Sequence, residues 1–306
     1  MTINSLSSFF INFFIITIFL FGCNDKQKSN LPDPDWFDID YSGKNHISQK
    51  MDIYLPKNKK KKHPPVIVIY GSGWSSNNKK FSNYQKKVFV KPLAEKGFAT
   101  IAINHRSSNL DSVFPAQIHD VKAAIRFLRA RHNDFNLDTS FIGIAGYSSG
   151  GHLAALAGTS SNNNLLKGNV GSYLNYENHV NAVVDFYGPT DLNVFYDCPI
   201  TKGKSLTKEQ KIRVFGNVEN ISEKFELANP IKYIDKNTPP FLIIHGEKDD
   251  VVPVCQSKLL HEALLKNNIE SELILNEDGD HNGNTLMPFQ TNLMANFFYK
   301  QYNKQL

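Results

Sequence analysis

The chain has 306 residues, of which 41% are hydrophobic and 12% aromatic, and its formal charge is +5. This length and apolar content suffice for one sizeable core, and 21% charged residues are too few for a wholly disordered chain. The modest charge does not indicate a nucleic-acid-binding protein, and the sequence contains no repeat of about 20–50 residues. We therefore expect one globular domain and no nucleic-acid partner.

The first 22 residues have the pattern of a signal peptide. Residues 9–21 form an almost continuous apolar stretch, which is shorter than the roughly 20 residues that a membrane-spanning helix needs. The stretch ends in Leu-Phe-Gly-Cys at Cys23, which resembles the lipobox of bacterial lipoproteins. That resemblance implies cleavage before Cys23, acylation of its thiol, and an exported, membrane-anchored lipoprotein on the periplasmic or cell-surface side. A plainly cleaved signal peptide and an uncleaved anchor are the alternatives.

A polar tether over residues 23–35 should then connect the anchor to the folded domain, residues 36–306. A basic run, Lys57 with residues 59–62, lies early in that domain and is followed by two prolines. We interpret this run as a solvated turn, because prolines and an asparagine punctuate it. The alternative is a patch for nucleic acid, membrane or another anionic polymer.

Two cysteines, Cys198 and Cys255, fall within the predicted domain. An oxidising compartment outside the cytoplasm permits a disulfide between them. Sequence alone does not place the two thiols within bonding distance, so a disulfide and two buried free thiols both remain open.

Apolar runs alternate with amphipathic stretches through the predicted domain. Six unbroken, β-branched runs are typical of strands covered on both faces: residues 66–70, 99–103, 141–147, 180–186, 241–245 and 270–275. Helical periodicity marks residues 115–132, 259–265 and 289–298. An antiparallel pair, residues 37–41 and 51–55, should precede them. This order predicts an α/β fold with a mostly parallel central sheet and helices on both faces.

Two segments interrupt the alternation, residues 160–178 and residues 191–234. We assign both to positions after strands, and therefore to the carboxyl edge of the sheet. Ligands bind at that edge in open α/β folds. We expect both segments to form short lids or loops that face the substrate.

The strongest local motif is Gly-Tyr-Ser-Ser-Gly-Gly, residues 146–151, with Ser148 at its third position. It follows a predicted strand and precedes an Ala- and Leu-rich helix, which is the context of a nucleophile elbow. The flanking glycines allow a sharp turn that lifts the serine hydroxyl above the sheet. Ser148 is therefore the candidate nucleophile.

A serine hydroxyl needs a base to accept its proton and an acid to orient that base, in the chain order Ser, Asp, His. Asp249 and Asp250 both follow the strand at residues 241–245, and either carboxylate could be the acid. His281 lies in a Gly-rich loop after the last predicted strand, where it can reach the serine. We expect His281 to be the base.

The strand at residues 66–70 runs into Gly-Ser-Gly-Trp, residues 71–74. Such a turn can aim backbone N–H groups at a carbonyl oxygen as it gains negative charge. The N–H of Ser149, next to the nucleophile, would complete this oxyanion hole.

From about residue 49 onward the chain resembles the bifunctional acetyl-xylan and feruloyl esterases of the α/β-hydrolase superfamily, which are close to the hormone-sensitive-lipase-like carboxylesterases. The matching stretches are residues 70–74, 114–124, 146–156, 185–191 and 245–253. The family pattern His-Gly-x-x-Asp-x-x-Val-Pro implies that Asp249 is the acid. It also implies that the amides of Ser72, Gly73 and Ser149 form the hole.

Two residues of the chain depart from the family motif His-Gly-Gly-Gly-Trp. Tyr70 stands at the position of its histidine, and Ser72 replaces a glycine. Both changes keep the backbone amides, so a hole can still form if Ser72 tolerates the local dihedral angles. Trp74 is either an aromatic platform for the substrate or a packed anchor of its loop.

Together these features predict a serine carboxylesterase that acts through an acyl-enzyme. The resemblance implies that its substrates are short-acyl or feruloyl esters on hemicellulose-type carbohydrates. A prolyl-oligopeptidase-like peptidase, which shares this type of elbow, and an inactive glycan-binding hydrolase-fold lipoprotein are the alternatives. The sequence contains no metal-ligand cluster, Walker loop or dinucleotide motif, so we expect no metal and no cofactor. The expected partners are a small-molecule or oligosaccharide ester and the membrane.

Overall fold

The computed structural model describes residues 31–57, 62–75, 81–110, 112–195, 207–216, 219–281 and 283–305. The signal segment, Cys23, most of the basic run and Cys198 lie outside these residues. Among the described residues, no helix has both the length and the apolar character needed to cross a membrane.

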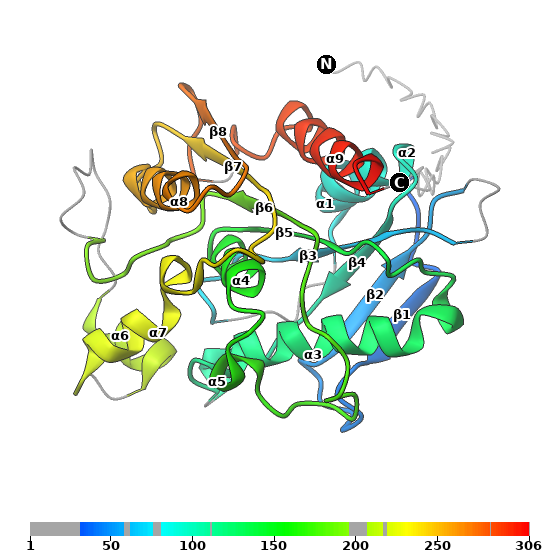
Figure 1. Ribbon diagram of the computed structural model, residues 1–306, viewed down its shortest axis with the longest axis horizontal. Helices are drawn as coiled ribbons and strands as arrows, with labels where there is room; N and C mark the ends of the chain where they lie inside the picture. Colours follow the sequence, from blue (N-terminus) through cyan, green and yellow to red (C-terminus); the bar gives the residue numbers. More distant parts are fainter. Residues whose placement is uncertain are drawn as a thin grey trace, which may run out of the picture. The chain divides into compact units, whose positions relative to one another are not determined.

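Eight strands in the described part of the chain form one sheet, in the order β1-β2-β4-β3-β5-β6-β7-β8 (Figure 1). Strands β3 to β8 run parallel to one another, whereas β2 pairs antiparallel with both β1 and β4. The bounds are β1 (Trp36–Asp40), β2 (Lys50–Tyr54), β3 (Pro65–Ile69), β4 (Ala99–Ile103), β5 (Gly143–Tyr147), β6 (Ala182–Phe186), β7 (Phe241–Gly246) and β8 (Ser271–Asn276). The predicted fold class is confirmed.

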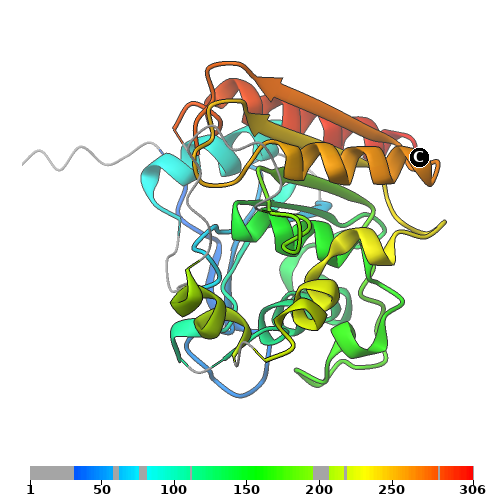
Figure 2. The same ribbon diagram turned by 90° about the vertical axis from the view of Figure 1, so that its left-hand side faces the viewer.

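Helices cover both faces of this sheet, because its central strands are apolar on both sides. One face packs against α3 (Ala116–Arg131), α4 (Ser149–Thr159) and α8 (Cys255–Lys266). The other packs against α9 (Pro288–Asn303) and the continuous run of α1 (Asn83–Gln85), one π-helical stretch η1 (Lys86–Val90) and α2 (Lys91–Glu95). Figures 1 and 2 show these two layers on opposite sides of the strands. The shorter helices are η2 (Ser108–Leu110), η3 (His132–Phe135), α5 (Asn164–Lys167), α6 (Lys208–Phe215), α7 (Ile221–Ala228) and η4 (Pro230–Tyr233).

The prediction that residues 160–178 face the substrate is wrong. This segment follows helix α4 and not a strand, and α4 leads the chain back from the carboxyl edge of the sheet to its amino edge. There α5 packs against α3, with Leu166 buried and the Arg126 guanidinium bonded to the carbonyl oxygens of Lys167 and Val170.

The carboxyl ends of the neighbouring strands β3, β5, β6 and β7 meet at one edge of the sheet. The loop with Ser72 and Gly73 leaves β3, Ser148 follows β5 directly, and Asp249 follows β7. His281 follows β8, next to β7. The topology therefore brings residues that are far apart in sequence to one place.

Candidate active site

Ser148 occupies a strained turn between β5 and α4. Its φ of 55° and ψ of −126° lie in a region that non-glycine residues rarely adopt, and its amide donates to the Phe186 carbonyl at 2.9 Å. The turn requires glycine at Gly146 and Gly150, because other backbone atoms lie very close to both positions. A Cβ on Gly146 would lie 2.2 Å from the Gly150 carbonyl oxygen, and one on Gly150 would lie 2.3 Å from that of Ile69. The turn can form only because both positions lack a side chain.

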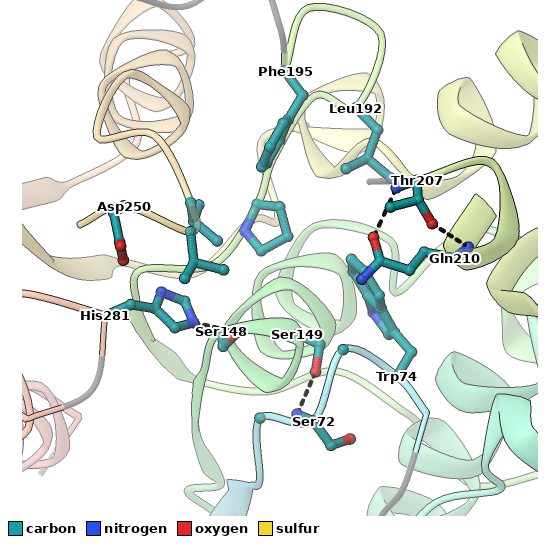
Figure 3. Close-up of a pocket in the computed structure, with 15 residues that line it drawn as sticks. Ser72, Trp74, Ser148, Ser149, Leu192, Phe195, Thr207, Gln210, Asp250 and His281 are labelled. Atoms are coloured by element: carbon teal, nitrogen blue, oxygen red, sulfur yellow. Dashed lines mark hydrogen bonds between the residues drawn. The ribbon is translucent and has the colours of Figure 1, made fainter. Parts of the chain in front are cut away.

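Ser148, His281 and Asp249 form one hydrogen-bonded chain. The Ser148 Oγ lies 3.0 Å from His281 Nε2 (Figure 3), and His281 Nδ1 lies 2.8 Å from Asp249 Oδ2. Asp250, the competing carboxylate, is exposed at the rim of the cavity. These distances suit proton transfer from the serine to the histidine, with the aspartate holding the imidazole in orientation.

The Asp249 carboxylate is buried and held at both oxygens. Oδ1 accepts the amides of Val251 and Val252, each at 2.8 Å, while Oδ2 faces His281. Burial alone would raise the pKa of Asp249, but hydrogen bonds from His245 and His281 outweigh it and bring the pKa well below its usual value. The carboxylate therefore stays ionised throughout the range in which the histidine can act as a base.

His245 is a supporting residue to which the sequence motif assigned no role. It is the fifth residue of β7, is fully buried, and lies 3.3 Å through Nε2 from Asp249 Oδ2. The same Nε2 lies 3.0 Å from the Val252 carbonyl oxygen, which can only accept, so Nε2 carries the hydrogen. Nδ1 then accepts from the Ser257 hydroxyl at 2.7 Å. His245 thus fixes the loop that carries the acid.

One amide of the predicted oxyanion hole has a hydrogen-bond acceptor within the protein. The Ser72 amide donates to the Ser149 Oγ at 2.9 Å, so in this structure it ties the loop to α4 (Figure 3). Ser72 needs no unusual dihedral angle, because the left-handed positions of this loop are Gly73 (φ 60°) and Trp74 (φ 57°). The amides of Gly73 and Ser149 remain the candidates for the hole.

Trp74 is an anchor of this loop and not an exposed platform. Its side chain is only 3% exposed, and its indole N–H donates to His152 Nδ1 at 3.2 Å. His152 is fully buried on α4, and its Nε2 donates to the Ala228 carbonyl at 2.7 Å. Desolvation lowers the pKa of His152 to about 4, so the ring is neutral and can accept the indole hydrogen bond. One edge of Trp74 still forms part of the cavity wall (Figure 3).

A cavity of about 550 Å³ opens above Ser148. Ser148, Ser149 and His281 line its floor together with Gly71, Ser72 and Gly73. Its apolar wall consists of residues from the loops after β6 and β7: Pro189, Leu192, Phe195, Val251 and Val252. Thr207 and Gln210, at the start of α6, add a polar side, so part of the segment 191–234 lines the cavity.

Among the described residues, no group of His, Cys, Asp and Glu side chains could hold a metal ion. Cys255, the first residue of α8, is disulfide-bonded, which excludes a free thiol there. The other two cysteines, Cys23 and Cys198, both lie outside the described residues.

Comparison with known proteins gives a consistent result. Residues 51–264 match the BD-FAE family. One similar solved structure is that of a bifunctional GH43-CE protein from Bacteroides eggerthii, with 43% sequence identity and a TM-score of 0.78. The match covers 87% of this chain and 35% of that protein's chain. The structure of a truncated carbohydrate esterase from gut microbiota is 36% identical and covers 90% of this chain and 98% of its own, with a TM-score of 0.80.

A curated relative, the esterase LipC of Mycobacterium tuberculosis, is 32% identical over 71% of this chain and 52% of its own length. The chain spans about half the length of the curated relatives it matches.

Proposed function

Because the chain belongs to the BD-FAE family of α/β-hydrolases, we propose that it is a serine carboxylesterase that removes short acyl or feruloyl groups from hemicellulose-type carbohydrates. The observation that carries this proposal is the chain of hydrogen bonds from the Ser148 Oγ through His281 to the ionised Asp249, at the floor of an open cavity. That arrangement can activate a serine for attack on an ester carbonyl.

In the first half-reaction His281 Nε2 takes the proton of Ser148 as Oγ bonds to the carbonyl carbon. The carbonyl π electrons move to oxygen, and the amides of Gly73 and Ser149 stabilise the resulting oxyanion. Each such donor contributes about 3–4 kcal/mol to stabilising the transition state. The bond to the alcohol oxygen then breaks, that oxygen takes the proton from His281, and an acyl-enzyme remains on Ser148.

In the second half-reaction His281 removes a proton from water, whose oxygen attacks the acyl carbon. Collapse of this second intermediate breaks the bond to Ser148, which recovers its proton from His281. The products are a carboxylic acid and a free sugar hydroxyl. Asp249 remains ionised throughout and holds the Nδ1–H of His281, so it stabilises the imidazolium of both steps.

The carbohydrate part of the proposal has two supports. Both solved structures described above come from proteins whose names include a carbohydrate esterase or a GH43-CE pair. In addition, the cavity combines an apolar wall with polar residues at the start of α6, which suits an acyl group carried on a hydroxyl-rich alcohol.

The decisive experiment is acetate and ferulate release by the purified chain from acetylated xylan and feruloylated oligosaccharides. Ser148→Ala should lower kcat by at least about 10⁴-fold, whereas exposed Ser140→Ala, as the matched control, should leave it unchanged. An active-site-directed phosphonate should label Ser148. Full activity of Ser148→Ala would refute the mechanism.

The same preparation separates the alternatives. Cleavage of a dipeptide amide at a rate comparable to that of an acetyl ester would indicate a peptidase. A folded wild-type chain that neither hydrolyses esters nor reacts with the phosphonate would indicate a binding protein.

We also propose that the protein is exported and anchored to a membrane through acylated Cys23. The support is the Leu-Phe-Gly-Cys sequence that ends the apolar stretch. Cys23→Ala should move the protein from the membrane fraction to the soluble fraction of the exporting cell, and mass spectrometry of the wild-type N-terminus should show an acylated cysteine. An N-terminus that begins elsewhere, without acylation, would refute the anchor.

A further inference from the structure

A second cavity, of about 490 Å³, lies next to the first. It is formed by the helical run α1–η1, the end of β5, and the loops that follow β3 and precede α9. Its wall is mainly aromatic, with the rings of Tyr70, Tyr84, Phe89 and Tyr147. The mechanism described above uses none of these side chains.

The two cavities meet at Gly71, which lines both. This residue lies very close to the nucleophile, because a Cβ added to it would be 2.8 Å from the Cβ of Ser148 and 2.3 Å from the Tyr147 carbonyl oxygen. The second cavity therefore begins within one residue of Ser148. A substrate whose ester carbon lies at Ser148 would have to pass Gly71 to reach it.

Hydrogen bonds hold the walls of this cavity in place. The Gln85 side-chain amide donates to the Tyr147 hydroxyl at 2.7 Å, and the Tyr84 hydroxyl donates to the Leu286 carbonyl at 2.8 Å. The Tyr70 and Tyr147 rings pack edge to face, with 5.2 Å between centroids. A preformed wall of this kind binds a ligand at little cost in side-chain entropy.

The catalytic groups line the first cavity, and the loop that carries the base also reaches the second. Ser148, His281 and the two amide candidates, Gly73 and Ser149, all line the first cavity, and none of them lines the second. The second cavity is lined by Gly283, two residues after His281, in the loop of the base. His281 must protonate the departing alcohol oxygen, so the alcohol begins beside this loop and can extend along it toward the second cavity.

The chemistry of the walls agrees with this placement of the alcohol. The first cavity offers Leu192, Phe195 and Val252 to an acyl group. The second combines aromatic rings with the hydroxyls of Tyr70, Tyr84 and Ser82, each of which has oxygen lone pairs to offer. A sugar ring has the matching surface, because its C–H faces pack on aromatic rings while its hydroxyls bond at the edge.

We propose that this second cavity binds the sugar ring of the alcohol part of the ester, with Tyr70 and Tyr84 as specificity-determining residues. The proposal rests on the proposed esterase function and names the subsite that its leaving group occupies. It also gives a role to Tyr70, which stands where the related esterases have a histidine.

The test uses Tyr84→Ala, because Tyr84 is 47% exposed and its replacement should leave the fold intact. Tyr176→Ala, at a tyrosine that is 44% exposed and lies in the loop after α5, is the matched control. Three substrates distinguish binding of the acyl part from binding of the alcohol part. Acetylated xylotriose has a small acyl group and a large alcohol, ethyl acetate has a small acyl group and a small alcohol, and methyl ferulate has a large acyl group and a small alcohol.

We expect Tyr84→Ala to raise KM for acetylated xylotriose about tenfold, with ethyl acetate and methyl ferulate unchanged and no effect of Tyr176→Ala. Unesterified xylotriose should bind the wild-type chain in calorimetry and bind Tyr84→Ala about tenfold more weakly. Tyr70→Phe should show a smaller loss of the same kind. Loss confined to methyl ferulate would place the acyl group in this cavity and overturn the proposal, as would equal loss for all three substrates or no loss.

The binding measurement keeps the two proposals separable. A wild-type chain that hydrolyses none of the esters refutes the esterase function. Xylotriose binding that is indifferent to Tyr84→Ala, in a chain that does hydrolyse esters, refutes only the sugar subsite.

Discussion

Replacing His152 with glutamine should remove a pH-dependent part of the stability of this protein. In the folded chain the pKa of His152 is lowered to about 4 by burial, whereas an unfolded histidine titrates near 6.5. Between these values the unfolded state binds a proton that the folded state does not, so the free energy of unfolding decreases as the pH falls from 6.5 to 4. A difference of this size corresponds to about 3 kcal/mol.

The structure also gives the local consequence of protonation. A proton on Nδ1 of His152 displaces the hydrogen bond from the Trp74 indole, which holds the loop after β3 against α4. Glutamine offers an oxygen to Trp74 and an N–H to the Ala228 carbonyl, so His152→Gln can keep both hydrogen bonds without a titrating group. The variant should therefore be close to the wild type in stability at pH 7.

Urea denaturation of wild type and His152→Gln at intervals from pH 7 to pH 4 measures the effect. From pH 7 to pH 4 the free energy of unfolding of the variant should rise by about 3 kcal/mol relative to that of the wild type. The reason is that the variant lacks the histidine whose protonation favours the unfolded state. His46→Gln, at an exposed histidine, is the control and should follow the wild type. A constant difference between wild type and His152→Gln across the range would refute the reasoning.

Three further predictions follow from the site and the core. Asp249→Asn should lower kcat for p-nitrophenyl acetate by about 10⁴-fold, since it removes the charge that orients the base. Asp250→Asn, at the exposed rim, is the control and should change kcat by less than about tenfold. Similar losses of kcat in both variants would contradict the assignment of Asp249 as the acid. Ser149→Ala should lower the free energy of unfolding by about 1–2 kcal/mol, because the Ser72 amide loses its acceptor, and an unchanged urea midpoint would show that this bond contributes nothing. Lys122 is buried, which lowers its pKa to about 7, so between pH 7 and 10.5 the unfolded state binds a proton that the folded state does not. As the pH rises over that range, the free energy of unfolding of the wild type should therefore increase by roughly 4 kcal/mol relative to that of Lys122→Met. Parallel stability curves for these two proteins would contradict this burial effect.

Much of the fold was predictable because its signals are local. The strand predicted at residues 99–103 is β4 with the same bounds, and the helix at residues 115–132 is α3 within one residue at each end. Unbroken β-branched runs and helical periodicity identify such elements without tertiary information. The error at residues 160–178 arose although the Ala- and Leu-rich helix predicted after Ser148 lies directly before this segment; that helix, and not a strand, leads into it and returns the chain to the amino edge of the sheet.

The residues of the candidate site also differ in how far the sequence alone identifies them. Ser148 could be found from the residues next to it, because the steric demands of its turn involve Gly146 and Gly150. Asp249 and His281 could be found from chain order, since parallel strands bring the ends of successive elements to one edge. The support by His245 could have been suspected from its place in the same short motif as Asp249, but its contacts to Val252 and Ser257 required the folded loop.

The sequence by itself therefore determined the alternating architecture, the turn at Ser148 and the set of groups available for acyl transfer. Only the tertiary structure decided how the loop after β3 is used: the Ser72 amide is taken by Ser149, 77 residues away, and the Trp74 indole by His152, 78 residues away. It also placed Tyr70 in the wall of a second cavity. These outcomes depend on which donors and acceptors meet when distant segments pack, and a buried polar group takes the partner that the fold brings within reach.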